Sequence, residues 1–214
     1  MQHLSAAQLY DALLAYLIVI ASLTLHEWGH AITADRLGDD TPRSQGRVTL
    51  NPLAHIDLFG TVILPLLGIF GNLPIIGWAK PVIINPANLP KTSDRAWVTI
   101  AGPAMNLFLA LISAVALGLC LRFSPSWNVA PLFALMLQIN VALMVFNLIP
   151  VPPLDGSKFL MYWFGMTPQT YVQFARFGWI ILMVLINIPQ TRNVFAHMIS
   201  ATLQPFILLA SWLR

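Results

Sequence analysis

Six long apolar runs divide this chain, and most polar residues gather between them. The runs lie at residues 9–34, 58–77, 97–121, 130–150, 171–189 and 194–213, with a shorter apolar stretch at 159–166. A helix needs about 20 apolar residues to cross the hydrocarbon core of a bilayer, and these runs have roughly that length. The pattern therefore predicts an all-α polytopic membrane protein with about five or six transmembrane helices.

The second run, residues 58–77, differs from the others. It contains four residues that disfavour a helix, namely Pro65, Gly68, Gly71 and Pro74. The preceding segment, residues 46–58, combines β-type residues at 48–50 with an Asn-Pro turn signal. We therefore expect a small membrane-associated β-hairpin or re-entrant element on the cytoplasmic side, whose strand edge can pair with an unwound peptide.

The composition strengthens the membrane prediction. Hydrophobic residues make up 57% and charged residues 9% of the 214 positions, whereas soluble domains carry about 25% charged residues. The net charge of +3 does not indicate a nucleic-acid partner, because the 11 basic residues are spread along the chain. Nucleic-acid binding needs a clustered basic face, so the lipid bilayer is the partner that the sequence predicts.

The basic residues indicate the orientation of the chain. Arg36, Arg43 and Arg47 follow the first run, and neither Lys nor Arg precedes it. Cytoplasmic loops of membrane proteins are enriched in Lys and Arg. We therefore expect the N-terminus outside and residues 36–57 in the cytoplasm, in an inner or plasma membrane.

The first run ends in a polar motif, His26-Glu27-Trp28-Gly29-His30. Side chains four residues apart share one face of a helix, so His26 and His30 can bind one Zn²⁺ ion through ring nitrogens. Glu27 lies beside such an ion, where it can take a proton from water. It is also the only glutamate in the sequence, and ionisable groups within a membrane are costly and usually functional. The motif predicts a hydrolytic zinc site with Glu27 as its catalytic residue.

A third zinc ligand must come from elsewhere, because catalytic zinc has three protein ligands and one open position. Asp155 stands out among the remaining His and Asp residues, since three prolines precede it and stop the preceding helix. We expect it to be the N-cap of a helix that continues from Gly156. His55 and Asp57 form a second candidate pair for a metal ion or a proton relay.

Three motifs together resemble the signature of the site-2 protease family of intramembrane zinc metalloproteases. They are HEWGH at 26–30, AGPAMN at 101–106 and NLIPVPPLDG at 147–156, in the order of that family. The matched core covers roughly residues 10–165. The chain resembles the compact branch without a PDZ domain, since only residues 122–129 lie where larger bacterial members carry PDZ modules.

The resemblance implies a set of roles. His26, His30 and Asp155 are then the zinc ligands, and Glu27 is the general base. Asn147 is expected to hold the substrate or the developing oxyanion. The implied activity is hydrolysis of a peptide bond within or near the transmembrane segment of single-pass membrane proteins.

Other roles remain open for parts of this pattern. Asn106 is a candidate substrate contact, with close helix packing as the alternative. The His/Asp cluster is also compatible with a metal-ion transporter or a non-proteolytic membrane binding protein. We expect one integral-membrane domain over residues 1–214, with extra helices at 168–214; the oligomeric state stays open.

Overall fold

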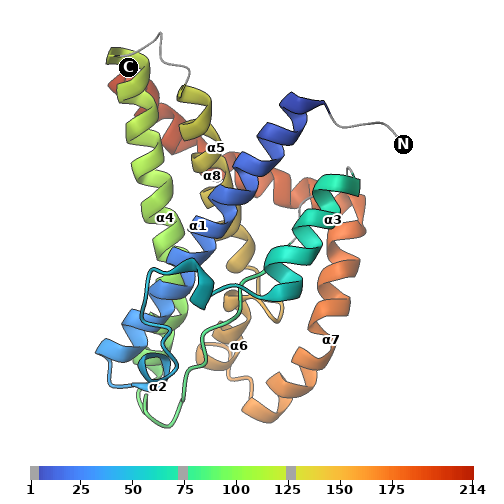
Figure 1. The fold of residues 1–214 in the computed structure, drawn as a ribbon. Helices are drawn as coiled ribbons and strands as arrows, with labels where there is room; N and C mark the ends of the chain where they lie inside the picture. The colour runs from blue at the N-terminus through green and yellow to red at the C-terminus, as the bar shows by residue number, and fades with distance from the viewer. Residues whose placement is uncertain (1–4, 72–76, 124–128) are drawn as a thin grey trace. The chain divides into compact units, whose positions relative to one another are not determined.

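The computed structural model describes residues 5–71, 77–123 and 129–214, and within these ranges every regular element is a helix (Figure 1). The chain forms two compact units, Met1–Leu89 and Pro90–Arg214. The all-helical prediction is confirmed, and the predicted β-hairpin is wrong for the described residues.

The first unit is built on one long helix, α1 (Ala6–Arg36). Ser5 begins it with a capping box, in which its hydroxyl accepts from the Gln8 amide and the Gln8 side chain accepts from the Ser5 amide. The short helix α2 (Thr41–Ser44) follows at the carboxyl end of α1, as Figure 1 shows. The capping box fixes where the first span begins, 20 residues before the HEWGH motif.

The segment at 46–58 forms turns and a short 3₁₀ helix, η1 (Pro52–Ala54), where we expected strands. The Asn51 side chain accepts a hydrogen bond from the Leu53 amide at 3.1 Å, and the Thr49 hydroxyl accepts from the Asn51 amide at 3.2 Å. Such local side-chain bonds offer the backbone an alternative to a β-ladder. The Asn-Pro turn signal was therefore the better guide to this segment than its β-type residues.

The second apolar run is helical but too short to cross a membrane in its described part. A π-helical turn, η2 (Leu58–Ile63), continues directly into α3 (Leu64–Gly71). Asp57 caps this element, because its carboxylate accepts from the amides of Phe59 and Gly60 at 3.1 and 2.7 Å. At about 1.5 Å per residue, the described part of this run is shorter than the hydrocarbon core of a bilayer, about 30 Å; the re-entrant element stays a prediction.

The second unit contains the other long helices, together with two short ones. They are α4 (Thr92–Phe123), α5 (Ala130–Asn147), η3 (Asp155–Lys158), α6 (Phe159–Tyr162), α7 (Pro168–Asn187) and α8 (Pro189–Leu213). Thr167 caps α7, whose first residue is Pro168, the common N-terminal combination. Pro189 begins α8, and the chain turns a corner there between α7 and α8 (Figure 1).

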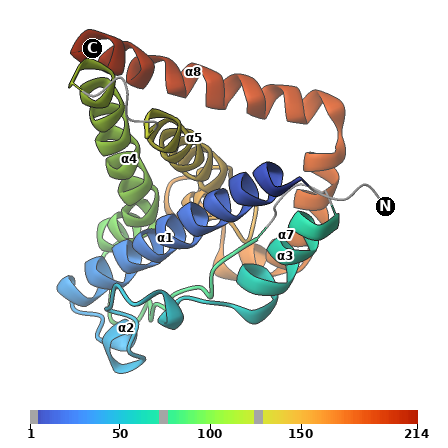
Figure 2. The same ribbon diagram turned by 45° about the horizontal axis from the view of Figure 1, so that its top comes forward.

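Within the second unit, α8 crosses over α4 and α5 (Figure 2). Gly118 permits this crossing, because an added Cβ would lie 2.6 Å from the Ala210 carbonyl oxygen on α8. An apolar cluster fills the space between these helices, and it consists of Ala110, Ala114, Leu137, Val141 and Val145. Small residues at such crossings are typical of membrane helix pairs.

Five described helices are long and apolar enough to span a membrane: α1, α4, α5, α7 and α8. They match five of the six apolar runs of the sequence. The prediction of an integral membrane protein is confirmed, and the described part of the chain supplies five candidate spans for the five or six that were expected.

Candidate metal and catalytic site

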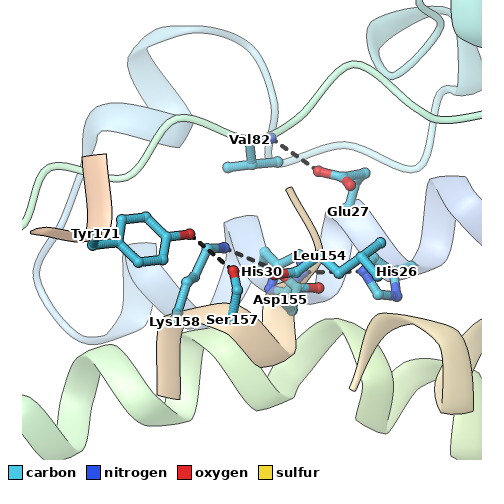
Figure 3. Close-up of polar contacts among 9 residues, drawn as sticks. All are labelled: His26, Glu27, His30, Val82, Leu154, Asp155, Ser157, Lys158 and Tyr171. Atoms are coloured by element: carbon cyan, nitrogen blue, oxygen red, sulfur yellow. Dashed lines mark hydrogen bonds and ion pairs between the residues drawn. The ribbon is translucent and has the colours of Figure 1, made fainter. Parts of the chain in front are cut away.

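His26 and His30 lie on one face of α1, as their spacing predicts (Figure 3). Their Nε2 atoms are 3.1 Å apart, and the two rings meet edge to face with centroids 4.8 Å apart. Both side chains are buried, with exposed fractions of 3% and 5%. The helix therefore places two imidazole nitrogens in direct proximity, away from solvent.

This pair fits a single zinc ion. Two nitrogens bound to one tetrahedral zinc at about 2.0–2.1 Å lie about 3.3 Å apart, close to the 3.1 Å between these Nε2 atoms. Imidazole nitrogen is also a ligand that zinc favours. His26 and His30 can therefore both hold the ion without a change in the backbone of α1.

Glu27 is half-buried on the same helix and is held by a backbone amide from far along the chain. Its Oε2 atom accepts a hydrogen bond from Val82 N at 2.9 Å, across 55 residues of sequence (Figure 3). Its other oxygen, Oε1, makes no hydrogen bond within the described part of the chain. One oxygen is thus fixed in place while the other remains able to accept a proton.

Asp155 lies in the second unit, at the first residue of η3, and is 7% exposed. The predicted N-cap role is wrong, because Leu154 precedes the helix and no side chain caps it. The Asp155 Oδ1 atom instead accepts from Lys158 Nζ at 2.9 Å. This buried carboxylate therefore already attracts a cation, which suits a metal ligand.

The loop before Asp155 is tightly packed against the end of α5. A Cβ added at Gly156 would lie 2.2 Å from the Leu148 carbonyl oxygen, so only glycine fits there. The loop also contributes Ile149, Val151 and Leu154 to an apolar cluster. These contacts explain why a glycine follows Asp155, and they fix the backbone that carries the carboxylate.

Helix α7 completes the support of this loop. Gly178 approaches the Pro152 carbonyl oxygen so closely that a Cβ would lie 2.3 Å from it. The Ser157 hydroxyl donates to the Leu154 carbonyl at 2.6 Å and lies 2.9 Å from the Tyr171 hydroxyl (Figure 3). Because the Ser157 proton is used in the first bond, the Tyr171 hydroxyl donates in the second. Helix α7 thus holds the Asp155 loop in place.

The two candidate asparagines have different surroundings. Asn147, at the end of α5, is half-buried and donates from Nδ2 to the Leu143 carbonyl at 3.0 Å. Its second amide hydrogen remains available for a substrate. Asn106 is fully buried, and its Nδ2 atom lies 3.4 Å from the Asn140 Oδ1 atom on α5. That position favours the packing alternative for Asn106.

His55 and Asp57 are engaged separately. The His55 Nε2 atom donates to the Thr49 carbonyl at 2.9 Å, whereas the Asp57 carboxylate caps η2. Burial and the charge of Arg47 lower the pKa of His55, against the opposing effects of Thr49 and Glu27. Within the described part of the chain, His55 and Asp57 do not belong to a group suited to hold a metal ion.

Two contributors to this site were not identified from the sequence. The Val82 amide is a backbone group, which no motif can mark. Arg47 was used only as an indicator of orientation, yet its guanidinium is 4% exposed and bonded to two carbonyls, those of Ala54 and Lys80. A basic residue that follows a glycine and precedes an Asn-Pro turn is a common pattern. It therefore does not predict that Arg47 is buried and bonded to two carbonyls.

Comparison with known proteins identifies close relatives. The family model "Peptidase family M50" matches residues 14–125 and 121–188. A Bacillus subtilis protein named "Putative zinc metalloprotease YwhC" is 34% identical over 203 residues, covering 89% of this chain and 88% of that protein. A Mycolicibacterium smegmatis protein named "Putative zinc metalloprotease Rip2" is 33% identical, covering 86% and 72% respectively. No solved structure matches this chain.

Proposed function

The chain belongs to peptidase family M50, and we propose that it hydrolyses a peptide bond within or near the transmembrane segment of single-pass membrane proteins. Family membership and the relatives' names confirm the prediction of an intramembrane zinc metalloprotease. Five apolar helices confirm its membrane location. The residue roles, the substrate class and the orientation are our proposals.

The ligands that we propose for zinc are His26, His30 and Asp155. The observation that carries this proposal is the 3.1 Å approach of two buried imidazole nitrogens on α1, with Glu27 next to them in the helix. A third, anionic ligand is needed for a catalytic site. Asp155 suits this role because it is a buried carboxylate in a loop whose backbone is fixed by packing.

Glu27 is the general base in this proposal. A bound zinc ion lowers the pKa of water and polarises the scissile carbonyl. Glu27 accepts the proton of the attacking water on Oε1, while Val82 N–H holds Oε2. The same carboxyl group then gives that proton to the leaving amine, so that one water is added across the peptide bond.

Asn147 is the residue that we propose for holding the substrate. Its one unengaged amide hydrogen can donate to the developing oxyanion, an effect that is typically worth about 10²–10³ in rate. Asn106 contributes by packing between α4 and α5. The cytoplasmic facing of the site, the external N-terminus and the location in an inner or plasma membrane follow from the distribution of Lys and Arg.

Zinc content and proteolysis, measured together, test these roles. Wild type, Glu27→Gln and Asp155→Ala are purified in detergent and assayed with a model transmembrane substrate. We expect wild type to hold about one zinc and to cleave, as three protein ligands imply. Glu27→Gln should keep zinc without cleaving, and Asp155→Ala should lose zinc.

Asp94→Ala is the matched control for Asp155→Ala, because Asp94 is also an acidic residue in the first turn of a helix but has no proposed zinc contact. It should keep both zinc and activity. A zinc-free wild type, or a Glu27→Gln variant that cleaves at the wild-type rate, contradicts the proposal. Metal transport or non-proteolytic binding would then be the functions to examine.

A further inference from the structure

Residues 78–85 come after α3 in the first unit and form no regular helix or strand; we call this segment the strap. Its backbone amides are bonded at alternate positions. Lys80 N donates to the His55 carbonyl at 2.9 Å, and Val82 N donates to Glu27 Oε2 at 2.9 Å. The strap is thus bonded both to the loop before η2 and to the carboxylate of Glu27.

Arg47 joins this strap to the loop that carries His55. Its guanidinium donates from Nη1 to the Ala54 carbonyl and from Nη2 to the Lys80 carbonyl. The side chain is 4% exposed. A guanidinium offers planar, fixed donor directions, so these two bonds set the distance and the orientation between loop and strap.

The connection from Arg47 to Glu27 is short and stiff. Arg47 binds the carbonyl of Lys80, and the amide that holds Glu27 belongs to Val82, two residues later. The intervening residue is Pro81, whose ring fixes its φ angle near −65° and restricts the residue before it. Few free torsions therefore separate the bonded carbonyl of Lys80 from the bonded amide of Val82.

The charge of Arg47 acts on the same carboxylate. Burial lowers the pKa of Arg47, whereas its attraction to Glu27 raises it. The guanidinium of Arg47 therefore attracts the carboxylate of Glu27. Arg47 is therefore linked to Glu27 in two ways, through the hydrogen bonds of the strap and through the attraction between their charges.

We propose that Arg47 is a positioning residue for peptide hydrolysis. It fixes the strap so that Val82 N–H orients one oxygen of Glu27 and leaves the other oriented for proton transfer. This role rests on the proposed function of Glu27 as general base. Without this support the Glu27 carboxylate would still be present but would not be oriented for proton transfer. Misplacement of a catalytic group by about 1 Å can lower the rate by about 10²-fold.

Kinetics on zinc-loaded enzyme separate this role from a general structural one. In Arg47→Gln we expect kcat to fall by about 10²-fold, with KM within about twofold and with zinc content unchanged. Arg47→Lys keeps the charge and a single donor nitrogen, so it should recover part of the lost kcat. A substrate-binding role predicts a raised KM, and a folding role predicts zinc loss; either result overturns the proposal.

Arg43→Gln is the matched control. Arg43 precedes Arg47 by four residues, but its guanidinium is 67% exposed and pairs with Asp35 through bonds of 2.7 and 2.5 Å. Removing this exposed charge should leave kcat at the wild-type value. An equal fall of kcat in Arg43→Gln and Arg47→Gln would show a general charge effect and overturn the positioning role.

A second variant tests the other end of the connection in case Arg47→Gln fails to fold. Val82→Pro removes the amide hydrogen that Glu27 accepts, and kcat should fall with KM and zinc retained. Val82→Ala is its control, because it shortens the side chain at the same position but keeps the amide hydrogen that Glu27 accepts. Wild-type kcat in Val82→Pro overturns the proposal.

The outcomes also distinguish this inference from the proposed function. If Glu27→Gln cleaves at the wild-type rate, the general-base assignment fails and the role of Arg47 fails with it. If Glu27→Gln is inactive while Arg47→Gln and Val82→Pro both keep wild-type kcat, only the positioning role fails.

Discussion

The helix that carries His26, Glu27 and His30 and the loop that carries Asp155 achieve their positions by different means. In α1, regular helical geometry brings the two Nε2 atoms within 3.1 Å, and neighbouring helix turns supply the backbone bonds. The Asp155 loop has no such regularity. Its position depends on the close packing of Gly156 against the Leu148 carbonyl. It also depends on two contacts from α7, namely Gly178 with Pro152 and Tyr171 with Ser157.

This difference has a consequence for tolerance to mutation. A helix distributes its stability over many equivalent hydrogen bonds, so one altered side chain changes little of the backbone. A loop fixed by a few close contacts can shift when a single one of these contacts is lost. We therefore expect conservative changes around Asp155 to affect the metal, whereas comparable changes around α1 affect mainly stability.

The largest effect is expected from Gly156→Ala. A Cβ there would lie 2.2 Å from the Leu148 carbonyl oxygen, so the loop must shift and carry Asp155 with it. We expect zinc affinity to fall by at least about 10–100-fold, the loss typical when support of a ligand is disturbed. Zinc competition with a chelating indicator in detergent measures this.

Gly165→Ala is the control for Gly156→Ala. Gly165 has a φ of +71°, so alanine is strained there by about 1–2 kcal/mol, but nothing lies within 4 Å of its Cβ position. Zinc affinity should stay at the wild-type value. If both variants bind zinc as tightly as wild type, the loop is not held by close packing and the comparison with α1 is mistaken.

The same contrast explains what the sequence could and could not predict. The spans at α1, α4, α5, α7 and α8 follow from length and apolar character, since a membrane helix satisfies its own backbone bonds. The pairing of His26 and His30 follows from helical spacing alone. Each of these predictions depends on residues close together in the chain.

The predictions that were wrong or missing depend on distant or competing contacts. Strands were expected at 46–58 because of β-type residues, but the side chains of Thr49 and Asn51 bond the local backbone instead. The bond from Val82 N to Glu27 spans 55 residues and uses a backbone donor. No residue pattern records such a bond, so it required the structure.

An intermediate effect is expected from Asp39→Asn, just beyond the end of α1. Asp39 is fully buried, and its carboxylate accepts from Thr41 Oγ1 at 2.6 Å, Asn85 N at 2.8 Å and Asn88 Nδ2 at 2.9 Å. Hydrogen bonds to a charged group are worth about 1.5–3 kcal/mol. We expect Asp39→Asn to lower the free energy of unfolding by about this amount near pH 7, with little change in zinc affinity.

The stabilisation that ionised Asp39 provides should depend on pH in a defined direction. Burial alone would raise the pKa of Asp39, but the bonds from Thr41, Asn85 and Asn88 outweigh it and hold the pKa below its ordinary value. The stabilisation is therefore complete above the unfolded pKa of about 3.9 and is lost as the pH falls through the lower folded value. Denaturant unfolding of zinc-free protein should show wild type and Asp39→Asn converging at low pH. A difference that stays constant with pH would contradict this origin.

The smallest effect is expected from Tyr171→Phe, which tests how far α7 supports the Asp155 loop. The variant removes one hydroxyl that donates to Ser157 at 2.9 Å, and a neutral hydrogen bond contributes about 1 kcal/mol. The loop keeps its packing at Gly156 and Gly178, so zinc affinity should fall by less than about tenfold, the equivalent of 1.4 kcal/mol. Tyr162→Phe is the control, because the Tyr162 hydroxyl bonds no described residue. An equal change of zinc affinity in the two variants would mean that the hydrogen bond from Tyr171 to Ser157 does not support the loop. Helix α7 would then act on Asp155 through apolar packing alone.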